Sequence, residues 1–241
     1  MYKLTDDAYV TGHEFYVDGN LTVMDAKIGN NWKTVLVIGM GHGGNGYMAI
    51  DVTNPTNPAL LWEFCNNSTY CTVTDSELGK ANGNPIVTKR ALDDKWVVYV
   101  TSGYDNSTGN GIIYELDVGT GEVLRKLGLS AADKTGVNAN NQVGIAKINT
   151  LYEDFSLDNK TKALYAGDLN GNIWKWDLSS NSTEAIAIGS AKDASGKAQP
   201  ITTKIELGKL SDGNILFITT GKYLNQDDLG NTDVQSVYGI K

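Results

Sequence analysis

Four similar segments recur along the chain, and this repetition limits the possible folds more than any other feature of the sequence. Their aligned ends place Asp51, Asp117, Asp177 and Lys241 in register, at separations of 66, 60 and 64 residues. The segments are TVLVIGMGHGGNGYMAIDVTNP, WVVYVTSGYDNSTGNGIIYELDVGTG, KALYAGDLNGNIWKWDLSSN and ILFITTGKYLNQDDLGNTDVQSVYGIK. A repeat of this kind is one structural unit that buries its apolar face against its neighbours, so the fold is a stack or ring of units.

Each repeat reads as short β-branched or aromatic runs separated by Gly, Asn and Asp turns, a pattern typical of antiparallel hairpins. The expected strands cover residues 21–28, 33–40, 47–53, 60–64, 84–90, 95–102, 112–118, 123–128, 144–151, 163–168, 172–178, 184–189, 201–208, 214–221 and 236–241. The first three repeats thus have four strands, and the last has three. Sheets of four antiparallel strands repeated along a chain indicate an all-β fold, a β-propeller with quinoprotein-like blades.

The predicted organisation is a single domain, 1–241, that forms part of a propeller. Its blades are expected at about 14–66, 80–130, 142–190 and 199–241, the last of them incomplete. The second strand of each blade is apolar at nearly every position, as expected for a strand that neighbouring blades cover on both faces. Fewer than four complete blades lie at or below the usual range for closure. The sequence therefore predicts a larger propeller, with further blades on either side and an export signal upstream.

The five tryptophans are Trp32, Trp62, Trp96, Trp174 and Trp176. They lie at strand starts or in third and fourth strands, and we expect them to pack between blades. A stacking platform for a ligand is the alternative.

Charge and hydropathy exclude two classes of partner. Lys and Arg number 20 against 28 Asp and Glu, and a formal charge of −8 repels phosphate backbones, so nucleic acid is not expected to bind. No apolar run approaches the roughly 20 residues that cross a bilayer, so membrane insertion is not expected either.

Cys65 and Cys71 are separated by five residues in CNNSTYC. This spacing suits a small loop closed by a disulfide. Two free, buried thiols are the alternative. If the two cysteines are paired, the protein belongs in an oxidising compartment such as a periplasm or cell surface.

Three stretches carry a family resemblance. WKTVLVIGMGHGGNGYMAIDVTNP (residues 32–55), YAGDLNGNIWKWDLS (165–179) and TTGKYLNQDDLGNTDVQSVYGIK (219–241) occur in this order. Together they resemble the C-terminal β-propeller of the PilC/PilY family of type IV pilus tip-associated biogenesis proteins and adhesins, and the resemblance runs from about residue 13 to the end.

The resemblance implies an exported, non-enzymatic protein at the pilus tip or outer-membrane surface of a Gram-negative bacterium. The propeller of such a protein supports pilus assembly or opposes retraction, and pilus subunits or minor pilins are its expected partners. Contact with a host surface is expected through regions outside this chain, since a variable N-terminal region mediates adhesion in this family.

The family also typically carries a calcium loop just before its Tyr-Ala-Gly-Asp strand. The matching positions are Asp154, Ser156, Asp158 and Lys160, the last through its backbone carbonyl, and oxygen ligands at alternate residues are what Ca²⁺ requires. Lys162 occupies the position of a final acidic ligand, and an ammonium group repels a cation. Two interpretations therefore stay open, a weakened Ca²⁺ site and a metal-free hairpin.

An enzymatic reading is the alternative function. Quinoprotein-type dehydrogenases use similar repeats to hold pyrroloquinoline quinone above Ca²⁺, and members resemble one another in a vicinal cysteine pair and an acidic base. Here the cysteines are five residues apart and no motif places an acid, so no quinone cofactor is expected. We assign no catalytic residue, because no Ser/His/Asp or Cys/His arrangement can be argued from the two histidines.

Overall fold

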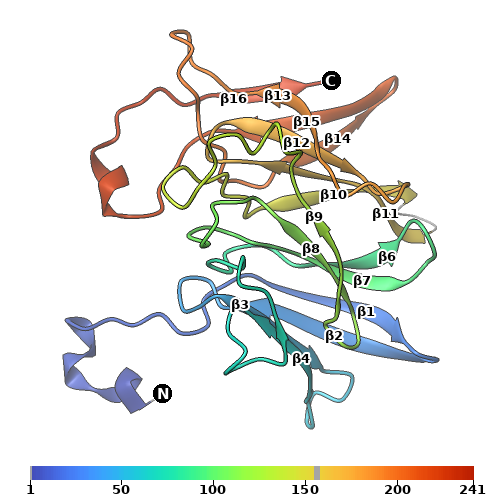
Figure 1. The fold of residues 1–241 in the computed structure, drawn as a ribbon. Coiled ribbons are helices and arrows are strands. Elements are labelled where there is room, and N and C mark those ends of the chain that lie inside the picture. Colours follow the sequence, from blue (N-terminus) through green and yellow to red (C-terminus); the bar gives the residue numbers. More distant parts are fainter. Residues whose placement is uncertain (1, 155–157) are drawn as a thin grey trace.

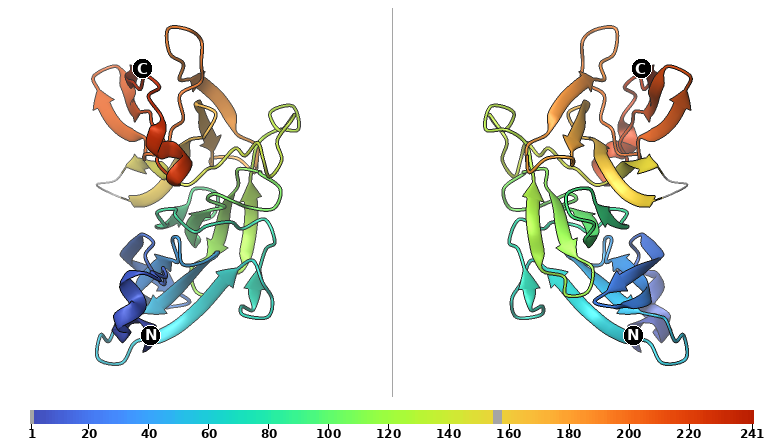
Figure 2. Two further views of the ribbon diagram at one scale, coloured as in Figure 1. Left: turned by 90° about the vertical axis from the view of Figure 1, so that its left-hand side faces the viewer. Right: turned by 90° about the vertical axis from the view of Figure 1, so that its right-hand side faces the viewer.

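The computed structural model describes residues 2–154 and 158–241, in which sheets of antiparallel strands follow one another around an arc (Figures 1 and 2). Blade 1 contains β1 (Leu21–Ile28), β2 (Asn31–Gly39), β3 (Gly46–Asp51) and β4 (Ala59–Cys65), with the two-residue β5 (Val73–Thr74) added parallel to β4. Blade 2 contains β6 (Ile86–Arg90), β7 (Trp96–Thr101), β8 (Ile113–Asp117) and β9 (Val123–Leu127). In both blades, consecutive strands pair antiparallel.

Blade 3 contains β10 (Ile148–Asp154), β11 (Asp158–Gly167), β12 (Asn172–Asp177) and β13 (Ile186–Ser190). Blade 4 contains β14 (Glu206–Leu210), β15 (Gly213–Thr219) and β16 (Val237–Ile240). Three short 3-10 helices complete the elements: η1 (Tyr2–Thr5), η2 (Asp7–Val10) and η3 (Gln226–Gly230). Every strand expected from the sequence overlaps one of these elements.

Three separate apolar cores lie between successive blades, which is the packing of a propeller. Alternate side chains of β7 supply two of them: Val98 and Val100 pack toward blade 1, whereas Val97 and Tyr99 pack toward blade 3. The third core lies between blades 3 and 4 and includes Leu216 and Ile218 of β15. A strand covered on both faces explains why β7 is apolar at almost every position.

Blades 2 and 3 are joined more closely than the other pairs. The first residues of β11 pair in parallel with the end of β6, through Lys160 with Lys89 and Thr161 with Arg90. The strands of the two blades therefore form one continuous eight-stranded sheet.

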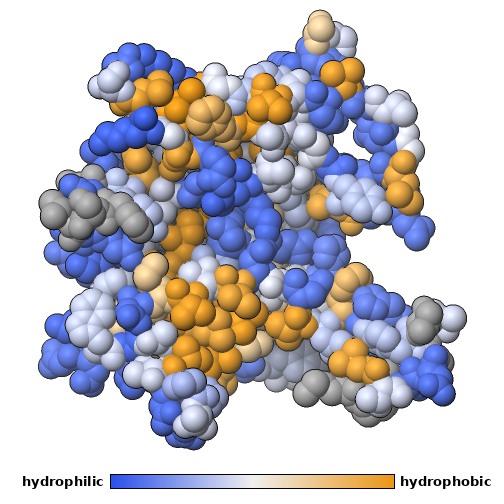
Figure 3. Space-filling model, turned by 180° about the vertical axis from the view of Figure 1, so that it is seen from behind, coloured by the Kyte–Doolittle hydropathy of each residue, from blue (hydrophilic) through white to orange (hydrophobic). Residues whose placement is uncertain are grey.

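The outer face of blade 1 carries exposed apolar side chains. Leu21 and Val23 of β1 and Leu60 of β4 are each at least half exposed. Figure 3 views the molecule from behind, and apolar side chains gather in its lower half, where blade 1 lies. None of the helices in the described part of the chain has the length and apolar character that a membrane crossing needs.

The tryptophan expectation is correct for three of the five side chains and wrong for one. Trp62, Trp174 and Trp176 are buried between blades, and Trp96 is half-buried. Trp32 is 61% exposed, because it lies at the start of β2 on the strand face opposite to that of the buried Val35 and Val37.

Candidate functional site

The stretch expected to resemble a calcium loop lies at the tip of the β10–β11 hairpin. Asp154 ends β10 and Asp158 begins β11, and the two are register partners across the hairpin. Ser156 lies outside the described residues. The metal-ligand assignment of Asp154, Ser156, Asp158 and Lys160 therefore stays a prediction.

Two lysines surround Asp158. Lys89 Nζ of β6 donates to Asp158 Oδ1 at 3.0 Å, and Lys160 Nζ lies 3.6 Å from Oδ2. The hydrogen bond from Lys89 lowers the pKa of Asp158. Lys160 also pairs with Asp94 of the β6–β7 turn at 2.7 Å. The carboxylate that a cation would need is thus already held by ammonium groups, so this donor set fits a cation only with low affinity.

A line of buried hydroxyls holds the hairpin to blade 2. Thr150 Oγ1 donates to Thr161 Oγ1 at 2.9 Å, Thr161 donates to Thr88 Oγ1 at 2.9 Å, and Thr88 donates to the Asn159 carbonyl at 2.6 Å. Thr88 and Thr161 are fully buried. The two fully buried hydroxyls, Thr161 and Thr88, each accept one hydrogen bond and donate another, so the line satisfies polar groups that would otherwise be costly to bury.

A buried charge network crosses the face of blade 2 that packs against blade 3. Glu115 of β8 is completely buried and pairs with Arg90 Nη1 at 3.0 Å and with Arg125 Nε at 3.0 Å. Tyr99 donates its hydroxyl to Glu115 Oε2 at 2.8 Å. Arg125 Nη1 also donates to the Ser180 carbonyl of blade 3 at 3.3 Å. Sequence reasoning missed this network, although a Glu within the apolar run IIYELDV was a visible signal.

The stretch AGDLNGNIW, residues 166–174, has a structural role. Asp168 follows β11 and is 1% exposed. Its carboxylate accepts from the Trp174 indole at 2.8 Å, from the Asn172 side chain at 2.9 Å and from the backbone N–H groups of Asn170 and Asn172. Burial raises the pKa of Asp168, and these donors oppose that shift. The residues of AGDLNGNIW therefore close the β11–β12 turn.

The aspartates that align across the repeats all make the same hydrogen bond. Asp51, Asp117 and Asp177 each end the third strand of a blade and accept from the backbone N–H two residues later, at 2.9 Å in all three. Hydrogen bonding lowers the pKa of Asp51 to about 2, with Lys33 contributing most and Thr53 next. These carboxylates fix the turn that leads into the fourth strand.

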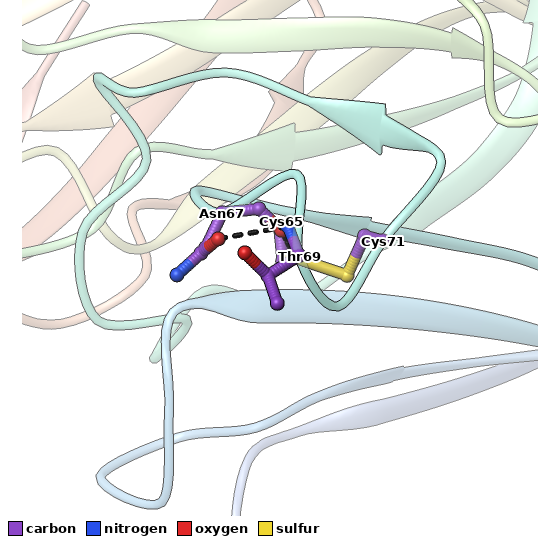
Figure 4. The surroundings of a disulfide bond; sticks show 4 residues. All are labelled: Cys65, Asn67, Thr69 and Cys71. Carbon is purple, nitrogen blue, oxygen red and sulfur yellow. Dashed lines mark hydrogen bonds between the residues drawn. A yellow bond between two sulfur atoms is a disulfide. The ribbon is translucent and has the colours of Figure 1, made fainter.

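Cys65 and Cys71 form a disulfide, so of the two alternatives the structure selects the paired one. The loop closes directly after β4, and Asn67 Oδ1 accepts from the Thr69 N–H at 2.8 Å within it (Figure 4). After the loop the chain pairs in parallel with β4 as β5. Parallel neighbours usually need a longer connection, and the disulfide holds this short one at the edge of blade 1.

The remaining polar loops have local roles. In the acidic stretch after β15, Asp228 accepts from the backbone N–H groups of Leu224 and Asn225 and pairs with Lys222 at 2.9 Å, and Asn225 caps η3. The described residues contain no cluster of three or more His, Cys, Asp or Glu side chains placed to hold a metal.

Comparison with known proteins agrees with this picture. The family model described as "PilY1 beta-propeller domain" matches residues 1–241. Among the curated relatives, the type IV pilus biogenesis factor PilY1 of Pseudomonas aeruginosa is 34% identical over 100% of this chain and 22% of its own length. A PilY1 homolog of Xylella fastidiosa is 32% identical over 100% of this chain and 18% of its own length.

Solved structures agree as well. The crystal structure of the Pseudomonas aeruginosa PilY1 C-terminal domain matches with a TM-score of 0.77 and 30% identity, over 97% of this chain and 51% of that chain. The resemblance and the β-propeller fold predicted from the sequence are both confirmed by these matches. The chain spans about a fifth of the curated relatives and about half of the solved domain.

Proposed function

Because the chain belongs to the PilY1 β-propeller domain family, we propose that it is the propeller module of a type IV pilus biogenesis factor. In this proposal the module supports pilus assembly or opposes retraction by binding pilus subunits or minor pilins through its surface. Family membership over the whole chain is the observation that carries the proposal. Adhesion to a host surface belongs to regions outside this chain.

The module works without catalysis. Support comes from the buried carboxylates Asp168 and Glu115, which are fully engaged in turn closure and ion pairing within the blades. The disulfide between Cys65 and Cys71 agrees with an extracellular location at the pilus tip or outer-membrane surface.

Deleting the region that encodes these residues from the chromosomal gene, in frame, tests the role. The expected result is a loss of surface pili, counted by electron microscopy, while the shortened protein is still exported. Repeating the deletion in a strain that cannot retract its pili separates the two roles: pili return if the module opposes retraction and stay absent if it supports assembly. Normal piliation in both strains would contradict the proposal.

A weak calcium site at the β10–β11 hairpin is the finer part of this proposal. Asp154, Asp158 and the Lys160 carbonyl, together with Ser156, would hold the ion, which would stiffen the hairpin by cross-linking its two strands. Lys89 and Lys160 compete with the ion for Asp158.

Calorimetric titration with Ca²⁺ tests this site. We expect saturable binding in the millimolar range that disappears in Asp154→Ala and becomes tighter in Lys162→Asp, because the latter restores a carboxylate in place of an ammonium group. Asp212→Ala, a change at an exposed aspartate of the β14–β15 turn, is the control. Absence of binding in both the parent and Lys162→Asp would exclude the site without touching the pilus role.

A further inference from the structure

A hollow of about 550 Å³ opens between blades 1 and 2, where the β1–β2, β6–β7 and β8–β9 turns meet. Trp32 of β2 and Trp96 of β7 form its aromatic wall, with ring centroids 5.7 Å apart and planes at 77°. A hollow of this size is typical of small-ligand sites.

Trp32 is the most exposed of the five tryptophans. Trp62 donates its indole N–H to the Val118 carbonyl at 2.9 Å, and Trp174 and Trp176 donate to the Asp168 carboxylate and the Gly128 carbonyl. Trp32 is 61% exposed and lines the hollow. A flat ligand that stacks on its exposed surface would bury a large apolar area at little entropic cost, since tryptophan has few rotatable bonds.

Charged side chains surround the aromatic wall. Lys27 is the register partner of Trp32, so the two side chains lie next to each other on one face of the β1–β2 hairpin. Lys89 Nζ lies 5.8 Å from the Trp96 ring centroid. Lys95 Nζ lies 3.3 Å from Asp117 Oδ2 at the opposite side of the hollow.

The charges of the hollow do not balance. Lys27, Lys89 and Lys95 face only two carboxylates, those of Asp94 and Asp117. Asp94 pairs with Lys160 and Asp117 with Lys95, while Lys89 pairs with Asp158. Among the ion pairs of the described residues, none involves Lys27. On a chain with a formal charge of −8, this local positive excess favours an anionic ligand.

We propose that this hollow binds an acidic saccharide. The C–H face of a pyranose ring packs on Trp32, the sugar carboxylate pairs with Lys27, and hydroxyl groups bond to the fixed carboxylates of Asp94 and Asp117. A quaternary ammonium ligand would meet three lysines and a single open ring face. An apolar peptide would bury the charged groups without partners. A free phosphate would gain nothing from the ring.

Titration of the chain with sialyllactose, with digalacturonate and with neutral lactose tests the site, using tryptophan fluorescence and ligand-observed NMR. We expect both acidic sugars to bind at millimolar concentrations and lactose to bind about fivefold more weakly, a factor that corresponds to the loss of one exposed ion pair. Trp32→Ala should abolish binding, and Lys27→Gln should reduce the affinity for the acidic sugars to that for lactose.

Matched variants control for misfolding and for nonspecific binding to exposed side chains. Tyr223→Ala removes an aromatic ring that is 71% exposed in blade 4, and Lys209→Gln removes an exposed lysine of β14. Both should bind as the parent does, and near-ultraviolet circular dichroism should show that all four variants are folded. The proposal is overturned if neither acidic sugar binds the folded parent, if Trp32→Ala binds them unchanged, or if lactose binds equally well.

Discussion

The two interfaces that flank blade 2 are built on different principles. Toward blade 1, β8 presents Leu116 to a core of apolar side chains, where Tyr47 donates to the Thr101 carbonyl at 3.1 Å. The ion pairs on this side join Asp75 and Glu77 to Lys126, a side chain that is 43% exposed. Toward blade 3, the preceding residue of β8, Glu115, lies completely buried in a network with Arg90, Arg125 and Tyr99. One strand thus faces a mainly apolar core on one side and a buried ion network on the other.

The difference predicts how each interface tolerates change. An apolar interface accepts other side chains of similar volume. A buried ion network gains little over an apolar replacement, but it is costly to break by removing one partner, because the remaining charges stay buried. The interface between blades 2 and 3 should therefore be the more sensitive to single substitutions and the less sensitive to complete replacement.

The largest effect is expected for Glu115→Ala. The change leaves Arg90 and Arg125 without their shared carboxylate, and we expect the free energy of unfolding to fall by about 3–5 kcal/mol. Urea unfolding followed by tryptophan fluorescence measures it. The combined change Glu115→Leu, Arg90→Met and Arg125→Met should recover most of the loss. A fall below about 1 kcal/mol in the single variant would mean that the network contributes no more than a surface pair.

Leu116→Ala tests the other face of the same strand. It removes a fully buried side chain from the interface with blade 1, and we expect a loss of about 3 kcal/mol. Leu116→Met keeps the volume and should cost less than about 1.5 kcal/mol. If both variants lose the same free energy of unfolding, this interface does not depend on side-chain volume. The contrast with the interface that contains Glu115 then disappears.

The third prediction concerns the hydroxyl line. Thr161→Val preserves shape but removes one donor and one acceptor, so Thr88 loses the hydrogen bond that it accepts and Thr150 keeps only its longer bond to the Ala163 carbonyl. We expect the free energy of unfolding to fall by about 1–3 kcal/mol. Thr203→Val, at an exposed threonine before β14, is the control and should change the unfolding free energy by less than about 0.5 kcal/mol. Hydrogen exchange should rise at β6 and β11 together in Thr161→Val, and a rise in only one of them would argue against a shared unit.

The smallest effect is expected at the rim of blade 1. The pKa of Asp51 is lowered to about 2 from its ordinary 3.8, chiefly by the hydrogen bond from Lys33. A lowered pKa stabilises the fold above the unfolded value, and this contribution is lost as the pH falls from about 4 through about 2. Carboxyl ¹³C NMR should give the midpoint. Lys33→Ala should move it upward, whereas an unchanged midpoint would assign the shift to Thr53.

Much of the fold follows from local pattern. The strand expected at 21–28 is β1 itself, and the strands of blade 2 differ from expectation by two residues or fewer at each end. In these strands apolar and polar side chains alternate, or turn residues stand at both ends. The nearby sequence therefore sets where each strand begins and ends. The spacing of Cys65 and Cys71 suits a disulfide loop but leaves two free thiols open, and the structure decides for the disulfide.

The rest depends on tertiary contacts that no local pattern contains. β5 is two residues long and exists because the disulfide returns the chain to β4. β11 begins at Asp158, five residues before the expected start, because its first residues pair with β6 and with β10. Trp32 starts a second strand, whereas the buried Trp62, Trp174 and Trp176 lie in third or fourth strands, and only the strand register shows that its face is not the buried one.

The parallel pairing of β6 with β11 has a mechanical consequence. Separating blades 2 and 3 requires breaking the backbone hydrogen bonds of two paired strands together with threonine bonds and ion pairs. Blades 1 and 2 are held mainly by an apolar core, with side-chain hydrogen bonds such as those of Tyr47 and Trp62. Under tension, the molecule should therefore yield first beside blade 1, and blades 2 and 3 should carry the load as one rigid body.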